Sequence, residues 1–194
     1  MSNEFLMIML AFAVSVALGM ALQVRRLQKV AKELRHNSEY DMLSGLKNRN
    51  AFDRQITRLE GRSITVLVCD IDNLKLTNDT LGHWAGDELI RKTAEILKRV
   101  CPPTSQIFRM GGDEFLALLP CEKDERAERQ IIASLEEAII SHNQTSENLK
   151  LSLSVGLAGT WDDEEAPFEI IRRADQAMYR QKHDSGASKA GYSR

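Results

Sequence analysis

Two short segments of the chain carry acidic residues directly beside apolar runs. In "VLVCDIDNLK", Asp70 and Asp72 stand at the end of a β-branched, apolar run. In "IFRMGGDEFLALL", Asp113 and Glu114 follow two glycines and lie between two apolar runs. Side chains alternate along a strand, so Asp70 and Asp72 are expected on one face of a sheet. Only one of the adjacent residues Asp113 and Glu114 is expected to face the same way, and alternation does not decide which.

Carboxylates brought together from separate strands repel one another unless a cation lies between them. Hard oxygen ligands of this kind suit Mg²⁺ or Mn²⁺, and Mg²⁺ commonly shares its coordination shell with phosphates. The two segments therefore predict a divalent metal, a nucleoside triphosphate, and phosphoryl or nucleotidyl transfer. There are structural alternatives: Gly111 and Gly112 could form an ordinary hairpin turn with positive φ, and Asp72 could stabilise a turn through its own side chain.

Other residues could complete a nucleotide site. The chain has neither a GxxxxGK[ST] nor a GxGxxG segment, which argues against P-loop and Rossmann sites. The candidate phosphate contacts are Lys75, His83, Arg109 and Lys182. Asn78 and Asp87 flank a glycine-containing segment, and a carboxylate suits the hydrogen-bond donors of guanine. The alternatives are solvated charges for the basic residues, a loop hydrogen bond for His83, and a charge in the first turn of a helix for Asp87.

The elements that must position these residues alternate between helix and strand. Apolar spacing and turn residues predict helices over 51–59, 123–143 and 168–184, and a glycine-containing loop that leads into a helix ending before Pro102. Strands are predicted over 63–72, 105–110, 114–120 and 149–159, the first of them buried and central. The pair around Gly111 and Gly112 predicts an antiparallel hairpin. The expected fold class is α+β, a mixed sheet layered with helices.

The N-terminal segment differs from the rest in composition. Residues 5–24 form a run of 20 whose only polar members are Ser15 and Gln23, and about 20 apolar residues cross a bilayer core. Residues 1–24 are therefore expected to be a short extracytoplasmic stub plus a transmembrane anchor, and residues 25–40 a basic helical linker. The linker's positive charges place it in the cytoplasm. A cleaved signal peptide is disfavoured because no positive segment precedes the run.

The overall composition limits the function classes. With 194 residues, 43% hydrophobic and 28% charged, the chain resembles an ordinary globular domain with additions. A net charge of -2 gives no support for a nucleic-acid binder. The three cysteines include no CxxC pair, which argues against a zinc site or a disulfide framework.

Five segments, in order, resemble the signatures of GGDEF-domain diguanylate cyclases: "DMLSGLKNR", "DIDNLKLTNDTLGHWAGDEL", "RMGGDEF", "LSVGLA" and "ADQAMYRQK". The resemblance covers residues 41–184 as a catalytic domain and leaves 185–194 as a flexible tail. It implies a nucleotidyl-cyclase or polymerase-palm-like sheet flanked by helices. It also implies condensation of two GTP into cyclic di-GMP by a homodimer, with Mg²⁺ (or Mn²⁺). The predicted anchor places this activity at the bacterial inner membrane.

The resemblance further implies roles for single residues. The metal ligands would be Asp70, the carbonyl of Ile71, and Asp113. The catalytic residues would be Asp113 as base, Glu114 as a candidate ligand of a second metal, and Lys75 as a stabiliser of charge. The substrate contacts would be Asn78, His83 and Asp87 for guanine, and Lys75, Lys182, Gly111 and Gly112 for the phosphates.

Two departures from the family pattern have consequences. Residues 102–105 read "PPTS" where the family's product-inhibition site has RxxD, so inhibition by that route is expected to be missing. The segment after Lys182 lacks an arginine that the family often has. The alternative function is therefore a catalytically weak GGDEF module that binds GTP or a partner protein.

Overall fold

The computed structural model describes residues 9, 15–28, 39–59, 63–120, 125–160 and 165–184, in two units, Met1–Ser38 and Glu39–Arg194. In the first unit, residues 15–28 form a helix whose side chains are all exposed. Within the described parts of the chain, no helix combines the length and apolarity needed to cross a membrane. The predicted anchor and linker lie only partly within the described residues, and the predicted tail lies outside them.

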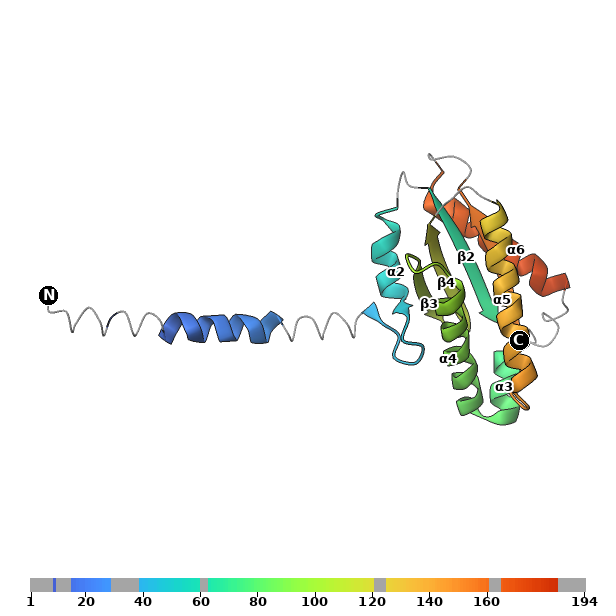
Figure 1. Ribbon diagram of the computed structural model, residues 1–194, viewed down its shortest axis with the longest axis horizontal. Helices are drawn as coiled ribbons and strands as arrows, with labels where there is room; N and C mark the ends of the chain where they lie inside the picture. The colour runs from blue at the N-terminus through green and yellow to red at the C-terminus, as the bar shows by residue number, and fades with distance from the viewer. Residues whose placement is uncertain are drawn as a thin grey trace. The chain divides into compact units, whose positions relative to one another are not determined.

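A five-stranded mixed sheet forms the centre of the second unit (Figure 1). Its strands, in spatial order, are β1 (Lys47–Asn48), β3 (Gln106–Gly111), β4 (Glu114–Pro120), β2 (Ile64–Ile71) and β5 (Leu153–Gly159). Strand β1 pairs with β3 in parallel, and the other pairings are antiparallel. Strand β2 is central and almost wholly buried, as its continuous apolar sequence predicted.

Helices cover both faces of the sheet. They are α2 (Arg49–Ile56), α3 (Leu74–Leu81), α4 (His83–Val100), α5 (Glu125–Thr145) and α6 (Pro167–Asp184). Helices α4 and α5 pack with Leu67 and Cys69 of β2 in one hydrophobic cluster, whereas α2 and α6 pack with Val66 in another. Because strand side chains alternate, Asp70 belongs to the same face as Val66, the face that α6 covers. The layered α+β architecture agrees with the prediction.

Helix α3 corrects the sequence prediction, which had its residues in a glycine-containing loop. It begins after Asn73, whose backbone is left-handed (φ 56°, ψ 25°), and it ends at Gly82 (φ 88°). Leu74 is its only buried residue. A single buried residue gives the sequence little sign of a packed helix, and in the structure α3 packs against α4.

The β3–β4 hairpin is confirmed, but its turn lies one residue further along than predicted. Gly111 is the last residue of β3 and pairs with Glu114, so the two-residue turn consists of Gly112 and Asp113. Gly112 has a positive φ (29°), and Gly111 does not. The register shift between Arg109 and Gly111 is the cause, because one extra residue in β3 moves the turn forward.

A glycine on β5 allows α6 to approach the sheet closely. A Cβ at Gly156 would lie 2.0 Å from the carbonyl oxygen of Ala174 and 2.4 Å from the backbone nitrogen of Met178. A larger residue would push α6 outward. The close approach brings Lys182, near the end of α6, to the carboxyl end of β2.

Candidate active site

An ion pair lies at the carboxyl end of the central strand. Nζ of Lys182 donates to Oδ1 of Asp70 at 2.6 Å, and Asp70 is buried. The two residues are 112 positions apart in sequence, so only the packing of α6 on the sheet brings them together. The chain itself thus supplies part of the positive charge that the buried acids require.

The hairpin brings the other two predicted acids to the same place. Glu114 is directly opposite Asp70 in the β2–β4 ladder, so both side chains project from the face covered by α6. Asp113 lies in the turn, and its carbonyl oxygen accepts a hydrogen bond from the nitrogen of Ile71 at 3.1 Å. The charge of its carboxylate acts on both Asp70 and Lys182. Strand alternation applies to Glu114 but not to Asp113, because Asp113 is a turn residue.

The charges of the side chains around the end of β2 favour binding of a further cation. Burial raises the pKa of Asp70 above its usual value, and the charges of Asp113 and Asp72 add to the rise despite the hydrogen bond from Lys182. Burial by itself would lower the pKa of Lys182, but Asp70, Asp113 and Asp72 outweigh it and raise that pKa. Three carboxylates around one ammonium group leave an excess of negative charge.

Asp72 makes a different set of contacts. Its Oδ2 accepts a hydrogen bond from Oγ of Ser152, and its Oδ1 accepts one from Oγ of Ser154, both at 2.6 Å. The backbone nitrogen of Asp72 also donates to the carbonyl of Ser152 at 3.0 Å. Asp72 therefore links β2 to β5 rather than closing a turn through its own side chain. The serines had no predicted role, although their spacing of two on a strand signals a shared face.

Arg109 braces the hairpin, a role that differs from its predicted phosphate contact. Its Nε and Nη2 donate to the carbonyl of Gly112 at 3.1 and 2.7 Å, and its Nη1 donates to Oδ1 of Asp41 at 3.0 Å. Asp41 in turn accepts hydrogen bonds from the backbone and hydroxyl of Ser44. The guanidinium thus holds the turn that carries Asp113. The segment "DMLSGL" contains Asp41, the partner of Arg109, but no role was predicted for this residue from the sequence.

Helices α3 and α4 bring together the residues predicted to bind guanine. Oδ1 of Asn78 is buried and has no hydrogen-bond partner among the described residues. A Cβ at Gly86 would lie 2.1 Å from this oxygen, and Gly86 directly precedes Asp87 on α4. A buried acceptor without a donor costs about 1–3 kcal/mol. The corner between α3 and α4 therefore has the form of a site that a ligand completes.

Three other predicted residues lie on the same two helices. Lys75 and His83 stand at the starts of α3 and α4, where both are exposed. Neither is hydrogen-bonded to Asp70 within the part of the chain that the structure describes. Asp87 is the fifth residue of α4, and the first turn of that helix contains no acid, so the alternative role as a first-turn charge does not hold.

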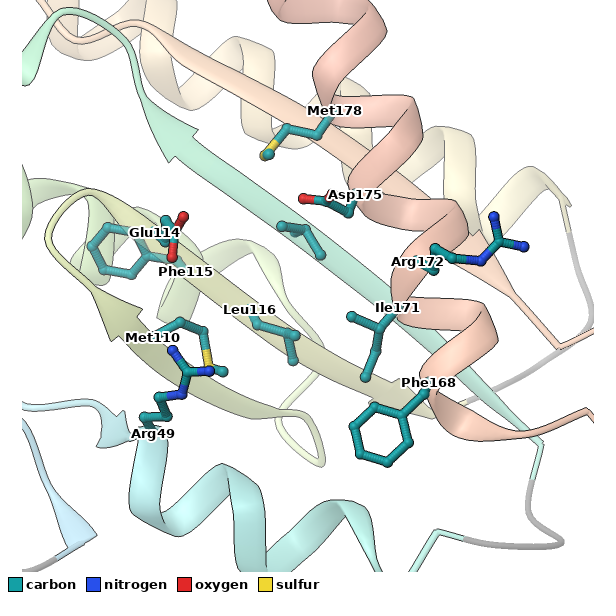
Figure 2. A pocket seen from close by; sticks show the side chains of 11 residues that line it. Arg49, Met110, Glu114, Phe115, Leu116, Phe168, Ile171, Arg172, Asp175 and Met178 are labelled. Atoms are coloured by element: carbon teal, nitrogen blue, oxygen red, sulfur yellow. The ribbon is translucent and has the colours of Figure 1, made fainter. Parts of the chain in front are cut away.

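A cavity of about 310 Å³ borders Glu114 on the same face of the sheet, between α2 and α6 (Figure 2). Figure 2 shows Glu114 on its hairpin side and Asp175 on its α6 side, with the apolar side chains of Leu116 and Ile171 lower in the view. Of the described residues predicted for catalysis or GTP binding, Glu114 alone lines it. The cavity is therefore separate from the corner between α3 and α4.

The donor atoms at the end of β2 fit a hard divalent cation. Asp70, Asp113 and the carbonyl of Ile71 would supply oxygen ligands, and water and phosphate oxygens would supply the others. Lys182 already brings a positive charge to Asp70 Oδ1. In the described ranges, no cluster of three or more His, Cys, Asp or Glu side chains could hold a metal. A metal here would therefore depend on main-chain and substrate oxygens as well.

The second unit is a mixed sheet flanked by helices. Its Gly-Gly-Asp-Glu hairpin lies beside a central strand that ends in Asp-Ile-Asp. Together these features define a GGDEF palm-like α+β domain. Residues 38–188 match the family described as "Diguanylate cyclase, GGDEF domain". The chain belongs to this family.

Individual relatives are similar to this chain in sequence and differ in name. Diguanylate cyclase VdcA of Vibrio cholerae is 30% identical over 169 residues, which cover 84% of this chain and 49% of that protein. Cyclic di-GMP phosphodiesterase NbdA of Pseudomonas aeruginosa is 30% identical over 168 residues, which cover 82% of this chain and 21% of that protein. The chain thus spans less than half the length of each, and it spans 27% of its relatives in Mycobacterium.

A solved structure supports the fold directly. The coiled coil and GGDEF domain of DgcB from Caulobacter crescentus, in complex with c-di-GMP, matches with a TM-score of 0.76 and 30% identity. The match covers 88% of this chain and 94% of that chain.

Proposed function

We propose that the protein is a diguanylate cyclase that joins two GTP molecules into cyclic di-GMP and releases two molecules of pyrophosphate. The observation that carries the proposal is the convergence of Asp70, Asp113 and Lys182, from three separate elements, at the carboxyl end of β2. The intact acids also argue against the alternative, a module that only binds GTP or a partner protein, because binding alone does not require both of them.

In this proposal GTP binds in two parts. Asn78 and Asp87, with His83 nearby, contact guanine, whose N1–H and amino group are donors that a buried carbonyl oxygen and a carboxylate can accept. Lys75 and Lys182 hold the triphosphate, and the backbone at Gly111 and Gly112 lies along it. Asp70, Asp113 and the Ile71 carbonyl would hold Mg²⁺ (or Mn²⁺), which would supply positive charge for the phosphates and the α-phosphorus.

The chain's own residues then direct the proton and the charge. Asp113 accepts the proton of the 3′-hydroxyl of the facing nucleotide. The freed oxygen forms a bond to the α-phosphorus, the bond from that phosphorus to the bridging oxygen breaks, and pyrophosphate leaves with the electron pair. Lys75 and Lys182 stabilise the charge that develops. Glu114, opposite Asp70, is the candidate ligand of a second metal.

The reaction must occur twice, and one site of this kind holds one GTP. Two domains therefore face each other in a homodimer.

We place the chain in the bacterial inner membrane through a single span at residues 5–24, with residues 25–40 as the linker and the domain in the cytoplasm. Tethering raises the local concentration of domains and favours their pairing. The apolar composition of residues 5–24 supports this placement, and a relative in Staphylococcus aureus is named an uncharacterized membrane protein.

The test is incubation of the purified full chain with GTP and Mg²⁺, with the product identified by mass. We expect cyclic di-GMP from the wild type and a loss of about 10³-fold in Asp113→Asn, because the asparagine cannot accept the proton. Asp53→Asn, which changes an exposed acid on α2, is the matched control and should retain activity. GTP binding without any cyclic di-GMP would overturn the proposal in favour of the binding module.

A further inference from the structure

Asp72 is the one acid at the end of β2 to which the proposed reaction gives no role. We infer that Asp72 is a positioning residue. Held by Ser152 and Ser154, it fixes the main chain between β2 and α3 and thereby sets where the Ile71 carbonyl and the Asp70 carboxylate lie for a divalent cation. The inference rests on the proposed function, because it concerns the same metal site.

The β2–β5 register explains how one carboxylate reaches two serines. Asp70 pairs with Ser154 and Ile71 pairs with Leu153, so Asp72 comes opposite Ser152. All four polar side chains therefore project from one face. Each oxygen of Asp72 accepts one hydrogen bond from a serine, and hydrogen bonds to a charged acceptor are short and strong. Asp72 could turn towards a metal only by breaking both of them.

The main chain beside Asp72 is held from both sides. On the hairpin side, the nitrogen of Ile71 donates to the carbonyl of Asp113 at 3.1 Å. On the β5 side, the nitrogen and the side chain of Asp72 bond to Ser152 and Ser154. The peptide that contains the Ile71 carbonyl therefore lies between two anchored residues, and the orientation of that carbonyl depends on both anchors.

The next residue shows why such an anchor is needed. Asn73 has a left-handed backbone, a conformation that asparagine adopts more readily than other residues with a side chain and that turns the main chain sharply from β2 into α3. Helix α3 follows at once and carries Lys75 in its first turn. Loss of the serine contacts would remove the anchor on the β5 side of this link and leave the Ile71 carbonyl free to move.

The test measures Mn²⁺ affinity, which does not require turnover. Titration of the full chain, with a GTP analogue whose α,β linkage resists cleavage, is followed by electron paramagnetic resonance. The double variant Ser152→Ala/Ser154→Ala keeps the charge of Asp72 but removes both donors. We expect Mn²⁺ affinity to fall by about 10–100-fold, the usual cost of losing contacts that orient metal ligands. Ser152→Thr keeps a hydroxyl donor and should bind Mn²⁺ as the wild type does.

Thr93→Val is the matched control for a general loss of stability. Thr93 is buried on α4, where its hydroxyl donates to the carbonyl of Leu89, on the opposite face of the sheet. This variant also loses a buried hydrogen bond, and it should retain Mn²⁺ affinity. If the double variant fails to fold, Ser152→Ala alone, at an exposed position, still tests the inference and should show a smaller loss.

Distinct results separate failure of the inference from failure of the proposed function. Unchanged Mn²⁺ affinity in the serine variants, or an equal loss in Thr93→Val, would overturn the positioning role while leaving the cyclase proposal intact. A wild-type chain that binds no Mn²⁺ with the GTP analogue would overturn both.

Discussion

The two ends of the proposed GTP site are built in opposite ways. At the end of β2, Asp70 is paired with Lys182, Asp72 with two serines, and the hairpin carbonyl of Gly112 with Arg109. At the corner between α3 and α4, Asn78 holds a buried oxygen with no partner among the described residues. The first end is assembled before any ligand arrives, whereas the second needs a ligand to complete its hydrogen bonds. Substitutions at the first end should therefore lower stability or metal binding, whereas substitutions at the second should lower affinity for the base without loss of stability.

The largest effect that would sharpen this comparison is expected at Asn78. In Asn78→Ala, affinity for GTP should fall by about 10–100-fold, because a hydrogen bond to the base is lost. The melting temperature should stay the same or rise, because an unpaired buried acceptor has been removed. Calorimetric titration and thermal melting together check this. A clear loss of stability with unchanged affinity would reverse the comparison.

Gly86→Ala provides the control for the same prediction. The added methyl group would displace the side chain of Asn78, so GTP affinity should fall although alanine favours the helix. In the Asn78→Ala background, Gly86→Ala should cause no further loss, because the two changes act through one contact. Additive losses would show that Gly86 acts by another route.

A smaller effect is expected at the hairpin brace. Arg109→Lys keeps a positive charge but cannot bond both Gly112 and Asp41 in the geometry of the guanidinium. The free energy of unfolding should fall by about 1–3 kcal/mol, as measured by urea denaturation. Arg91→Ala, which breaks an exposed pair with Glu88 on α4, should cost less than about 0.5 kcal/mol. Equal costs would mean that the brace is no stronger than a surface ion pair.

The smallest effect is a pH dependence at Asp41. Burial would raise its pKa, but hydrogen bonds from Ser44 and the guanidinium of Arg109 outweigh burial and hold the pKa below its usual value of 3.8. Because the folded pKa is the lower one, Asp41 stabilises the fold above 3.8, and this contribution is lost as pH falls through the folded pKa. Asp41→Asn should therefore be less stable than the wild type at neutral pH, and the difference should shrink in acid. A difference that grows in acid would contradict the assignment.

Local patterns in the sequence predicted much of the fold and part of the site. The strand before Asp70, the hairpin around the glycines and the helices on either side follow from apolar spacing and turn residues, and the structure contains them. Helix α3 was missed because only Leu74 is buried, and the turn was misplaced by one residue because a bulge leaves no trace in composition. The contacts of Arg109, which was only a candidate for phosphate binding, could not be predicted because its partner Asp41 is 68 residues away.

What the sequence determined alone is approximately where the four longer strands run and which side chains share a face within one strand, because those properties depend on near neighbours along the chain. Only the tertiary structure decided that Lys182 meets Asp70 across 112 residues and that Ser154 meets Asp72 across 82. Those meetings depend on which strands become neighbours and on how closely α6 approaches β5 at Gly156. Strand order and packing distance are properties of three-dimensional packing, and alternation along one strand does not specify them.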